Sequence, residues 1–171
     1  MNEKIKIYRS SKYALLPQKG SSHAVGWDIR ADLSSLALEE YNNGVRNVSF
    51  DEFLIDFSII IKPHEIRVIP TGLHVELEPD MEMDIKSRSG LFSREGLLAI
   101  GTIDPDYRGE IGIMVINLGK KDIQIRHGER IAQAVIRKVY NNDSLFVEVY
   151  DFSNLKETDR GKNGFGSTGK K

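Results

Sequence analysis

The chain has 171 residues, of which 40% are hydrophobic, and its 24 basic and 25 acidic side chains leave a formal net charge of -1. This is enough for one hydrophobic core, and the balanced charge excludes the broad positive field that holds polymeric nucleic acid. Cysteine is absent, which excludes disulfides and thiolate metal sites, and no run reaches the ~20 apolar residues of a membrane span. We expect a cytoplasmic protein with a small ligand and no membrane partner.

Short runs of alternating apolar and polar residues recur along the chain and predict half-buried strands. In chain order these runs are residues 4–8, 55–61, 65–69, 74–77, 111–116, 123–125, 133–139 and 145–149. Turn-forming residues such as proline, glycine and asparagine lie between them. The pattern is typical of antiparallel sandwiches and barrels, so we predict an all-β, single-domain jelly roll or distorted β-barrel.

Three stretches depart from this pattern. Residues 34–53 lack clean alternation and predict an insertion with a short helix or an ordered excursion, and residues 87–98 suit one short helix. Residues 158–171 are rich in glycine and polar residues, with Phe165 as their only large apolar side chain. We therefore expect a barrel domain at 1–157 and a flexible, glycine-rich C-terminal arm at 158–171.

Two segments carry residue types suited to phosphate chemistry. Asp104, Asp106 and Tyr107 share one tight connection, where a carboxylate can align and deprotonate water, although an ordinary hairpin with solvated acids has the same composition. The sequence Arg88-Ser89-Gly90 combines a guanidinium fork, a hydroxyl and an unhindered amide before a helix. That combination favours phosphate binding, with a helix cap beside a surface arginine as the alternative.

Three further positions are ambiguous when they are taken alone. Gln133 can lie on a solvated strand face, and Asp28 can cap a turn. The arm is either a disordered end or a lid over a ligand, because its glycines let the backbone approach closely and Phe165 offers a face for a base. It is not a Walker A loop, because Lys170 follows Ser167 and Thr168 instead of preceding them.

Five segments, in this order and with compatible gaps, resemble the five motifs of the trimeric dUTPase family. They are Ala24-Val25-Gly26-Trp27-Asp28, Arg88-Ser89-Gly90-Leu91, the nine residues from Gly101 to Gly109, Gly128-Glu129-Arg130-Ile131-Ala132-Gln133, and the ten residues from Arg160 to Gly169. One departure is Ser87, which stands where the family usually has proline. The resemblance implies hydrolysis of dUTP to dUMP and pyrophosphate by a homotrimer with shared active sites.

The resemblance also implies a role for each candidate residue. Asp104 orients and deprotonates the attacking water, Tyr107 packs beneath the deoxyribose, and backbone groups of residues 100–103, including Gly101 and Ile103, read the uracil edge. The phosphate contacts are assigned to Arg88, Ser89, Gly90 and Gln133. The lid contacts are assigned to Arg160 on the γ-phosphate, Phe165 on uracil, and Gly166, Ser167 and Thr168.

Mg²⁺ is the cofactor that the resemblance implies, held mainly by substrate phosphates and reaching Asp28 through water at most. Two alternatives remain at this point. A dCTP deaminase shares the fold, but it would need an acid or base aimed at the cytosine amine and lacks an arm like residues 158–171. A nucleotide-gated interaction protein would use the lid to signal to a partner, with residues 34–53 as a candidate contact.

Overall fold

The computed structural model describes residues 5–140, 145–158 and 161 of the chain. They fall into two units, with the boundary between Val139 and Tyr140. Within the second unit, the described residues contain one short 3-10 helix, η1 (Phe152–Asn154). The proposed domain boundary at residue 157 stays a prediction.

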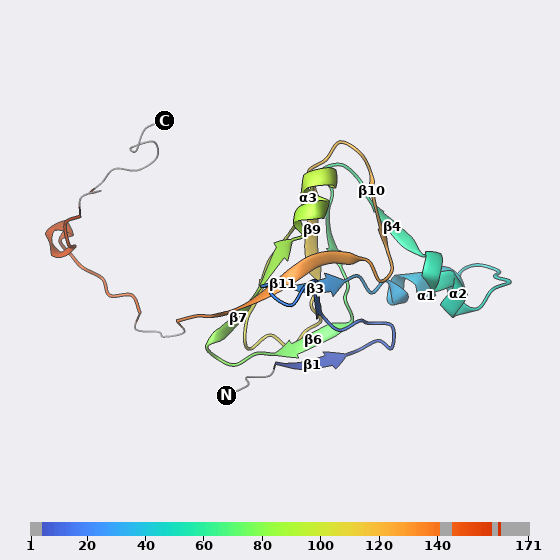
Figure 1. Cartoon of the computed structure of the whole chain (residues 1–171), viewed down its shortest axis with the longest axis horizontal. Coiled ribbons are helices and arrows are strands. Elements are labelled where there is room, and N and C mark those ends of the chain that lie inside the picture. The colour runs from blue at the N-terminus through green and yellow to red at the C-terminus, as the bar shows by residue number, and fades with distance from the viewer. Residues whose placement is uncertain (1–4, 141–144, 159–160, 162–171) are drawn as a thin grey trace. The chain divides into compact units, whose positions relative to one another are not determined.

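The first unit is built from eleven strands in the described part of the chain (Figure 1). They are β1 (Lys6–Arg9), β2 (Gln18–Lys19), β3 (Trp27–Arg30), β4 (Ser58–Ile61), β5 (Ile66–Ile69), β6 (Leu73–Glu76), β7 (Met81–Ser87), β8 (Leu97–Ile103), β9 (Ile113–Asn117), β10 (Ile123–Arg126) and β11 (Arg130–Lys138). Seven form one sheet in the order β2-β3-β11-β7-β8-β9-β5, while β1 pairs with β6 and β10 with β4. Every pairing is antiparallel, which confirms the all-β prediction.

The core lies on one face of the seven-stranded sheet, because its strands alternate buried apolar residues with outward-facing ones. In β7, Met81, Met83 and Ile85 are buried, whereas the residues between them are polar and partly exposed. In β9, Ile113 and Val115 are buried beside Asn117. The Asn117 amide bonds the carbonyls of Ile61 and Lys121, so it meets the hydrogen-bonding needs of the β9–β10 turn inside the core.

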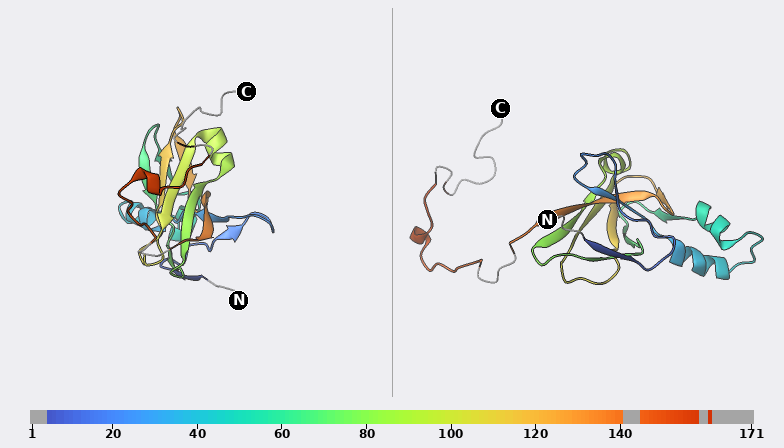
Figure 2. Two further views of the ribbon diagram at one scale, coloured as in Figure 1. Left: turned by 90° about the vertical axis from the view of Figure 1, so that its left-hand side faces the viewer. Right: turned by 60° about the horizontal axis from the view of Figure 1, so that its bottom comes forward.

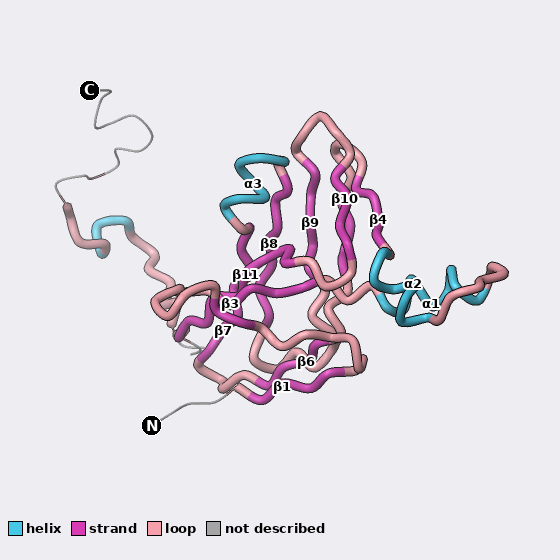
Figure 3. The backbone as a smooth tube through the Cα atoms, turned by 45° about the vertical axis from the view of Figure 1, so that its right-hand side comes forward, coloured by secondary structure: helices cyan, strands magenta, loops and turns pink. Residues whose placement is uncertain are grey.

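Three α-helices interrupt the strands in the described residues, where the sequence predicted one. Helix α3 (Ser89–Glu95) fills the predicted position between β7 and β8, and it ends at Gly96 with φ of 78°. The helices α1 (Ser34–Asn42) and α2 (Phe50–Asp56) make up the predicted excursion. Figures 1 and 3, and the turned views of Figure 2, show both standing out beside the start of β4, away from α3. None of the helices in the described ranges has the length and apolar character needed to span a membrane.

One strand prediction is wrong, one begins too early, and four strands were missed. Residues 55–56 belong to α2, which begins directly after Ser49 because Ser49 and Glu52 form a capping box. Residues 145–149 are not a strand, and Phe146 and Val147 are 90% and 81% exposed. A strand needs a hydrogen-bonded neighbour as well as alternation, and the structure pairs no strand with this segment. The missed strands are β2, β3, β7 and β8.

The excursion is joined to the barrel at His127. The imidazole Nδ1 accepts a hydrogen bond of 3.1 Å from the Leu33 amide at the start of α1, so this nitrogen carries no proton. The His127 ring also packs edge-on against Tyr13, whose hydroxyl donates to Asp51 of α2. Burial lowers the pKa of His127 below its ordinary value of 6.5, and the nearby carboxylate of Asp32 opposes this effect only in part.

We predict that the protein loses stability as the pH falls below about 6.5, because the unfolded chain then binds a proton that folded His127 resists. The contribution is complete above the unfolded pKa and is lost as the pH falls towards the lowered folded pKa. Melting temperatures measured between pH 7.5 and 5.5 should fall less steeply for His127→Asn, which retains an acceptor near Nδ1. His23→Asn is the control, because His23 is exposed and its replacement should leave the slope unchanged. An unchanged slope in His127→Asn would contradict the assignment of this pH dependence to His127.

Candidate functional site

Two of the predicted site residues, Asp28 and Gln133, lie on the outer face of the seven-stranded sheet, opposite the core. The strand registers place one row of side chains across this face: Asp28 lies opposite Gln133, Gln133 opposite Lys86, and Lys86 opposite Ile100. The row continues from Ile100 to Met114 and then to Val68. Directly opposed side chains share one face, so this surface changes from polar at β3, β11 and β7 to apolar at β8, β9 and β5.

A charged cluster occupies the polar side. One carboxylate oxygen of Asp28 accepts from Nε of Arg88 at 3.0 Å, and the other accepts from the Arg130 guanidinium at 3.1 Å. The Arg88 guanidinium also bonds the Arg130 carbonyl at 3.2 Å. The side chain of Asp28 is 15% exposed, compared with 29% for Arg88 and 45% for Arg130. Asp28 therefore fixes the direction of two guanidinium groups whose remaining N–H groups face outwards.

Gln133 joins the same cluster through a hydrogen bond of 3.1 Å from its amide to the Ser87 carbonyl. Gly26 makes room for it, since a Cβ at Gly26 would lie 2.6 Å from the Gln133 Oε1. Ser87, where the family usually has proline, uses its hydroxyl to bond both the amide and the carbonyl of Ala99. The serine thus extends the β7–β8 pairing to the residue before Arg88.

Ser89 and Gly90 are the first two residues of α3, directly after Arg88. Ser89 is exposed and Gly90 is partly exposed. The structure therefore brings together Asp28, Arg88 and Gln133, with Ser89 and Gly90 directly after Arg88, while their role in phosphate binding stays a prediction. Sequence reasoning did not assign a role to Arg130, although its position opposite Asp28 follows once β3 and β11 are paired.

Asp104 and Tyr107 lie on the turn that joins β8 to β9. Asp104 is exposed and follows Ile103, the last residue of β8. The Tyr107 hydroxyl donates to the Glu110 carbonyl at 3.0 Å, which folds the ring back over Gly109. A Cβ at Gly109 would lie 2.3 Å from that hydroxyl, so the ring position requires glycine there.

The charged cluster and the Asp104 turn lie at opposite ends of the β7–β8 pair. Met83 is opposite Ile103, so Asp104 is level with Glu82, and Arg88 lies six residues further along (88 − 82 = 6). At about 3.3 Å per residue the two groups are about 20 Å apart within one chain. A triphosphate is much shorter than this. The two groups therefore lie far apart on one copy of the chain.

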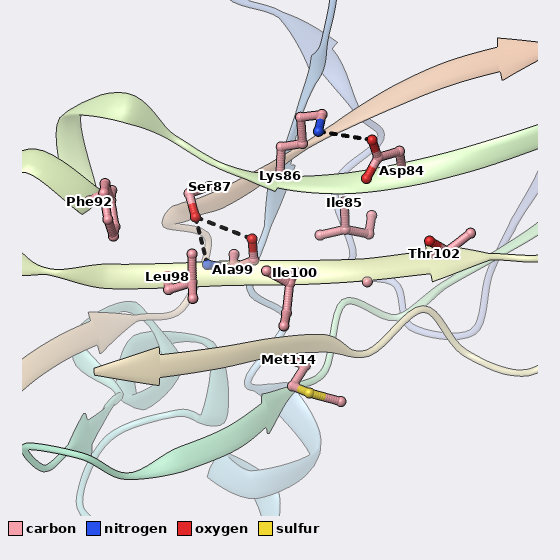
Figure 4. A pocket seen from close by; sticks show the side chains of 11 residues that line it. Asp84, Ile85, Lys86, Ser87, Phe92, Leu98, Ala99, Ile100, Thr102 and Met114 are labelled. Atoms are coloured by element: carbon pink, nitrogen blue, oxygen red, sulfur yellow. Dashed lines mark hydrogen bonds and ion pairs between the residues drawn. The ribbon is translucent and has the colours of Figure 1, made fainter. Parts of the chain in front are cut away.

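An apolar face covers the other half of the sheet. We define it by the five exposed residues Ile66, Val68, Phe92, Ile100 and Met114. A pocket of about 570 Å³ opens on this face between α3 and the β7–β8–β9 surface, and Phe92, Ile100 and Met114 of the face line it together with Lys86 (Figure 4). A contiguous exposed apolar surface of this kind marks a site of protein association.

Five of the predicted arm residues, Arg160, Phe165, Gly166, Ser167 and Thr168, lie outside the described residues. A search of the described ranges finds no group of three or more histidine, aspartate or glutamate side chains placed to hold a metal ion. Asp28 also has both carboxylate oxygens engaged by arginine. These residues do not form a protein-only metal cage, but they suit a metal that is carried on phosphate oxygens.

The fold and site define an all-β barrel protein whose outer face offers guanidinium and hydroxyl groups to an anionic ligand. Comparison with known proteins names the family. A family model described as dUTPase matches residues 53–169. A deoxyuridine 5'-triphosphate nucleotidohydrolase of Orientia tsutsugamushi (strain Boryong) is 39% identical over 175 residues and covers 100% of both chains. The chain belongs to the dUTPase family.

Solved structures support the fold. A dUTPase of Staphylococcus bacteriophage 80alpha with dUpNHpp matches with a TM-score of 0.72 and 23% identity, covering 99% of each chain. The dUTPase from phage phi11 of S. aureus, described with a structural Mg(II) ion, matches with a TM-score of 0.67 and 20% identity over 88% of this chain and 99% of that one. At this identity they show the shared jelly-roll fold alone.

Proposed function

We propose that the chain hydrolyses dUTP to dUMP and pyrophosphate. The observation that carries the proposal is the turn after β8, where an exposed carboxylate, Asp104, stands three residues before the fixed ring of Tyr107 inside the region matched by the dUTPase family model. The similar protein of Orientia tsutsugamushi is named for the same hydrolysis. We further propose a cytoplasmic setting, which the absence of cysteine favours.

In the proposed reaction, Asp104 holds a water molecule in line with the α-phosphorus and accepts its proton as the water oxygen attacks. The bond from that phosphorus to the bridging oxygen breaks, and pyrophosphate leaves with the electron pair. Tyr107 lies beneath the deoxyribose, where its ring would meet a 2′-hydroxyl. The backbone of Gly101 and Ile103, at the end of β8, reads the uracil edge.

The phosphates are proposed to bind the charged cluster. Arg88, already oriented by Asp28, supplies positive charge, while Ser89, the Gly90 amide and Gln133 supply directional hydrogen bonds. Arg160, Phe165, Gly166, Ser167 and Thr168 complete the clamp from the arm. Mg²⁺ bound to the phosphate oxygens supplies further positive charge against the leaving pyrophosphate. Asp28 would meet it only through water, since both carboxylate oxygens accept from arginine.

We propose a homotrimer in which neighbouring copies share each active site. Because the charged cluster and the Asp104 turn are about 20 Å apart in one chain, one copy must supply the cluster and another the turn. The apolar face provides the surface on which copies meet. The comparisons favour neither the deaminase nor the interaction protein as an alternative.

The first test measures pyrophosphate release from dUTP, dCTP, dTTP and UTP, with and without Mg²⁺. We expect selective release from dUTP with Mg²⁺, and we expect Asp104→Asn to lower that rate at least ~10²-fold while nucleotide affinity is kept, because a positioned general base is lost. Asp106→Asn is the matched control, since it removes a second exposed carboxylate from the same turn. Unchanged turnover in Asp104→Asn would eliminate the mechanism.

Removal of the arm tests the lid. A chain that ends at Asp159 should keep its melting temperature, because the described barrel makes its core without the arm, and it should lose nearly all activity, because the clamp on the triphosphate is incomplete. Thermal denaturation and pyrophosphate release on one preparation would measure both. Full activity of the shortened chain would refute the lid.

The shared-site proposal predicts that charge on the apolar face separates the copies. Met114→Glu should change a trimer into monomers in sedimentation velocity and abolish activity, because no site is then complete. Ile60→Glu is the matched control: Ile60 lies on β4, outside the apolar face, and is 42% exposed compared with 43% for Met114. A wild-type chain that is monomeric and fully active would overturn the proposal.

A further inference from the structure

The turn that carries Asp104 has its own internal hydrogen bonds. The Tyr107 amide donates to the Asp104 carbonyl at 3.1 Å, and the Arg108 guanidinium donates to the carbonyls of Pro105 and Tyr107 at 2.6 and 2.9 Å. These contacts shape the turn. They do not decide where the whole turn lies on the barrel, because both partners of each bond belong to residues 104–108.

Glu110 makes the connection to the barrel. One oxygen of its carboxylate, Oε1, accepts from the backbone amides of Thr71 and Gly72, at 2.9 and 2.7 Å. Its carbonyl accepts from the Tyr107 hydroxyl at 3.0 Å. The next residue, Ile111, is held by the same segment, since its carbonyl accepts from the Thr71 hydroxyl at 2.6 Å. Glu110 therefore links the aromatic ring of the turn to a fixed pair of amides.

The segment that receives Glu110 is held on several sides. Thr71 is fully buried, and Gly72 has φ of 64°, which turns the two amides towards one acceptor. A Cβ at Gly72 would lie 2.6 Å from the Asp32 carboxylate and 2.7 Å from the Ala14 side chain. The amide of Asp32 bonds the Pro70 carbonyl at 2.8 Å. This close packing leaves the amide pair little freedom to follow a displaced turn.

A further contact between the turn and the barrel is weaker. The His74 Nδ1 lies 3.1 Å from the Arg108 carbonyl, and the contact is exposed to solvent. One exposed hydrogen bond contributes less than a carboxylate that accepts two amides. Loss of the Glu110 carboxylate would therefore free the turn to shift while its internal bonds persist.

We propose that Glu110 is a positioning residue that sets the place of Asp104 and Tyr107 against the substrate. The proposal rests on the proposed dUTP hydrolysis. Glu110 touches no reacting atom; it acts through the turn, and its carboxylate length and acceptor oxygen are the features that matter. A displacement of about 1 Å at a reacting centre can lower the rate about 10²-fold.

The test uses three variants of the full chain, with kcat, KM and melting temperature measured for each. Glu110→Ala removes the acceptor and Glu110→Asp withdraws it by one methylene, so we expect kcat to fall about 10-fold or more in both, at temperatures well below melting. Glu110→Gln keeps an oxygen that can accept both amides and should retain most of kcat. A purely structural role would lower the melting temperature and leave kcat of the folded protein unchanged.

Glu65→Ala is the matched control. Glu65 is partly exposed like Glu110 and accepts from the Lys62 amide at 2.8 Å in a turn away from the site, so its loss should leave kcat unchanged. Wild-type kcat in folded Glu110→Asp or Glu110→Ala, or an equal loss in Glu110→Gln, would overturn the positioning role. If Glu110→Ala does not fold, Glu110→Asp decides. Failure of the wild-type chain to hydrolyse dUTP would instead contradict the proposed function.

Discussion

The antiparallel pairing of β7 with β8 is the constraint on which the site depends. Because the strands run in opposite directions, the residue that follows β8, Asp104, and the residue that follows β7, Arg88, emerge at opposite ends of the pair. Their separation of about 20 Å is a property of the backbone and no side-chain rotation removes it. The proposed chemistry, which combines them, therefore calls for more than one copy of the chain.

The outer face of the sheet has the composition that such an assembly needs. Across the row from Asp28 to Val68, polar side chains give way to apolar ones at β8. The apolar half exposes hydrophobic surface to water in a single chain. This exposure is explained if copies meet there and place the charged cluster of one copy beside the Asp104 turn of the next copy. Association and catalysis then depend on the same surface.

The sequence predicted which site residues lie together better than it predicted the strands around them. The resemblance to the five motifs grouped Asp28, Arg88 and Gln133, and the structure brings these three side chains together, while their roles stay a prediction. The strand at residues 145–149 failed because alternation describes one strand, whereas a strand also needs a neighbour, which can lie on another chain. β8 was missed because the sequence of Leu97–Ile103 does not alternate apolar with polar residues, and the ion pair of Arg130 follows only from register.

Asp28 explains how a site can be strongly cationic before its ligand arrives. Two neighbouring guanidinium groups repel each other. The partly buried carboxylate of Asp28 holds one nitrogen of each at about 3 Å, and the group formed by Asp28, Arg88 and Arg130 keeps a net positive charge. Each guanidinium has five N–H donors, so the bonds to Asp28 and to the Arg130 carbonyl leave others available for phosphate oxygens. If the triphosphate binds here as proposed, much of the ordering that binding requires is complete in the folded protein, which leaves more of the interaction energy for holding the ligand.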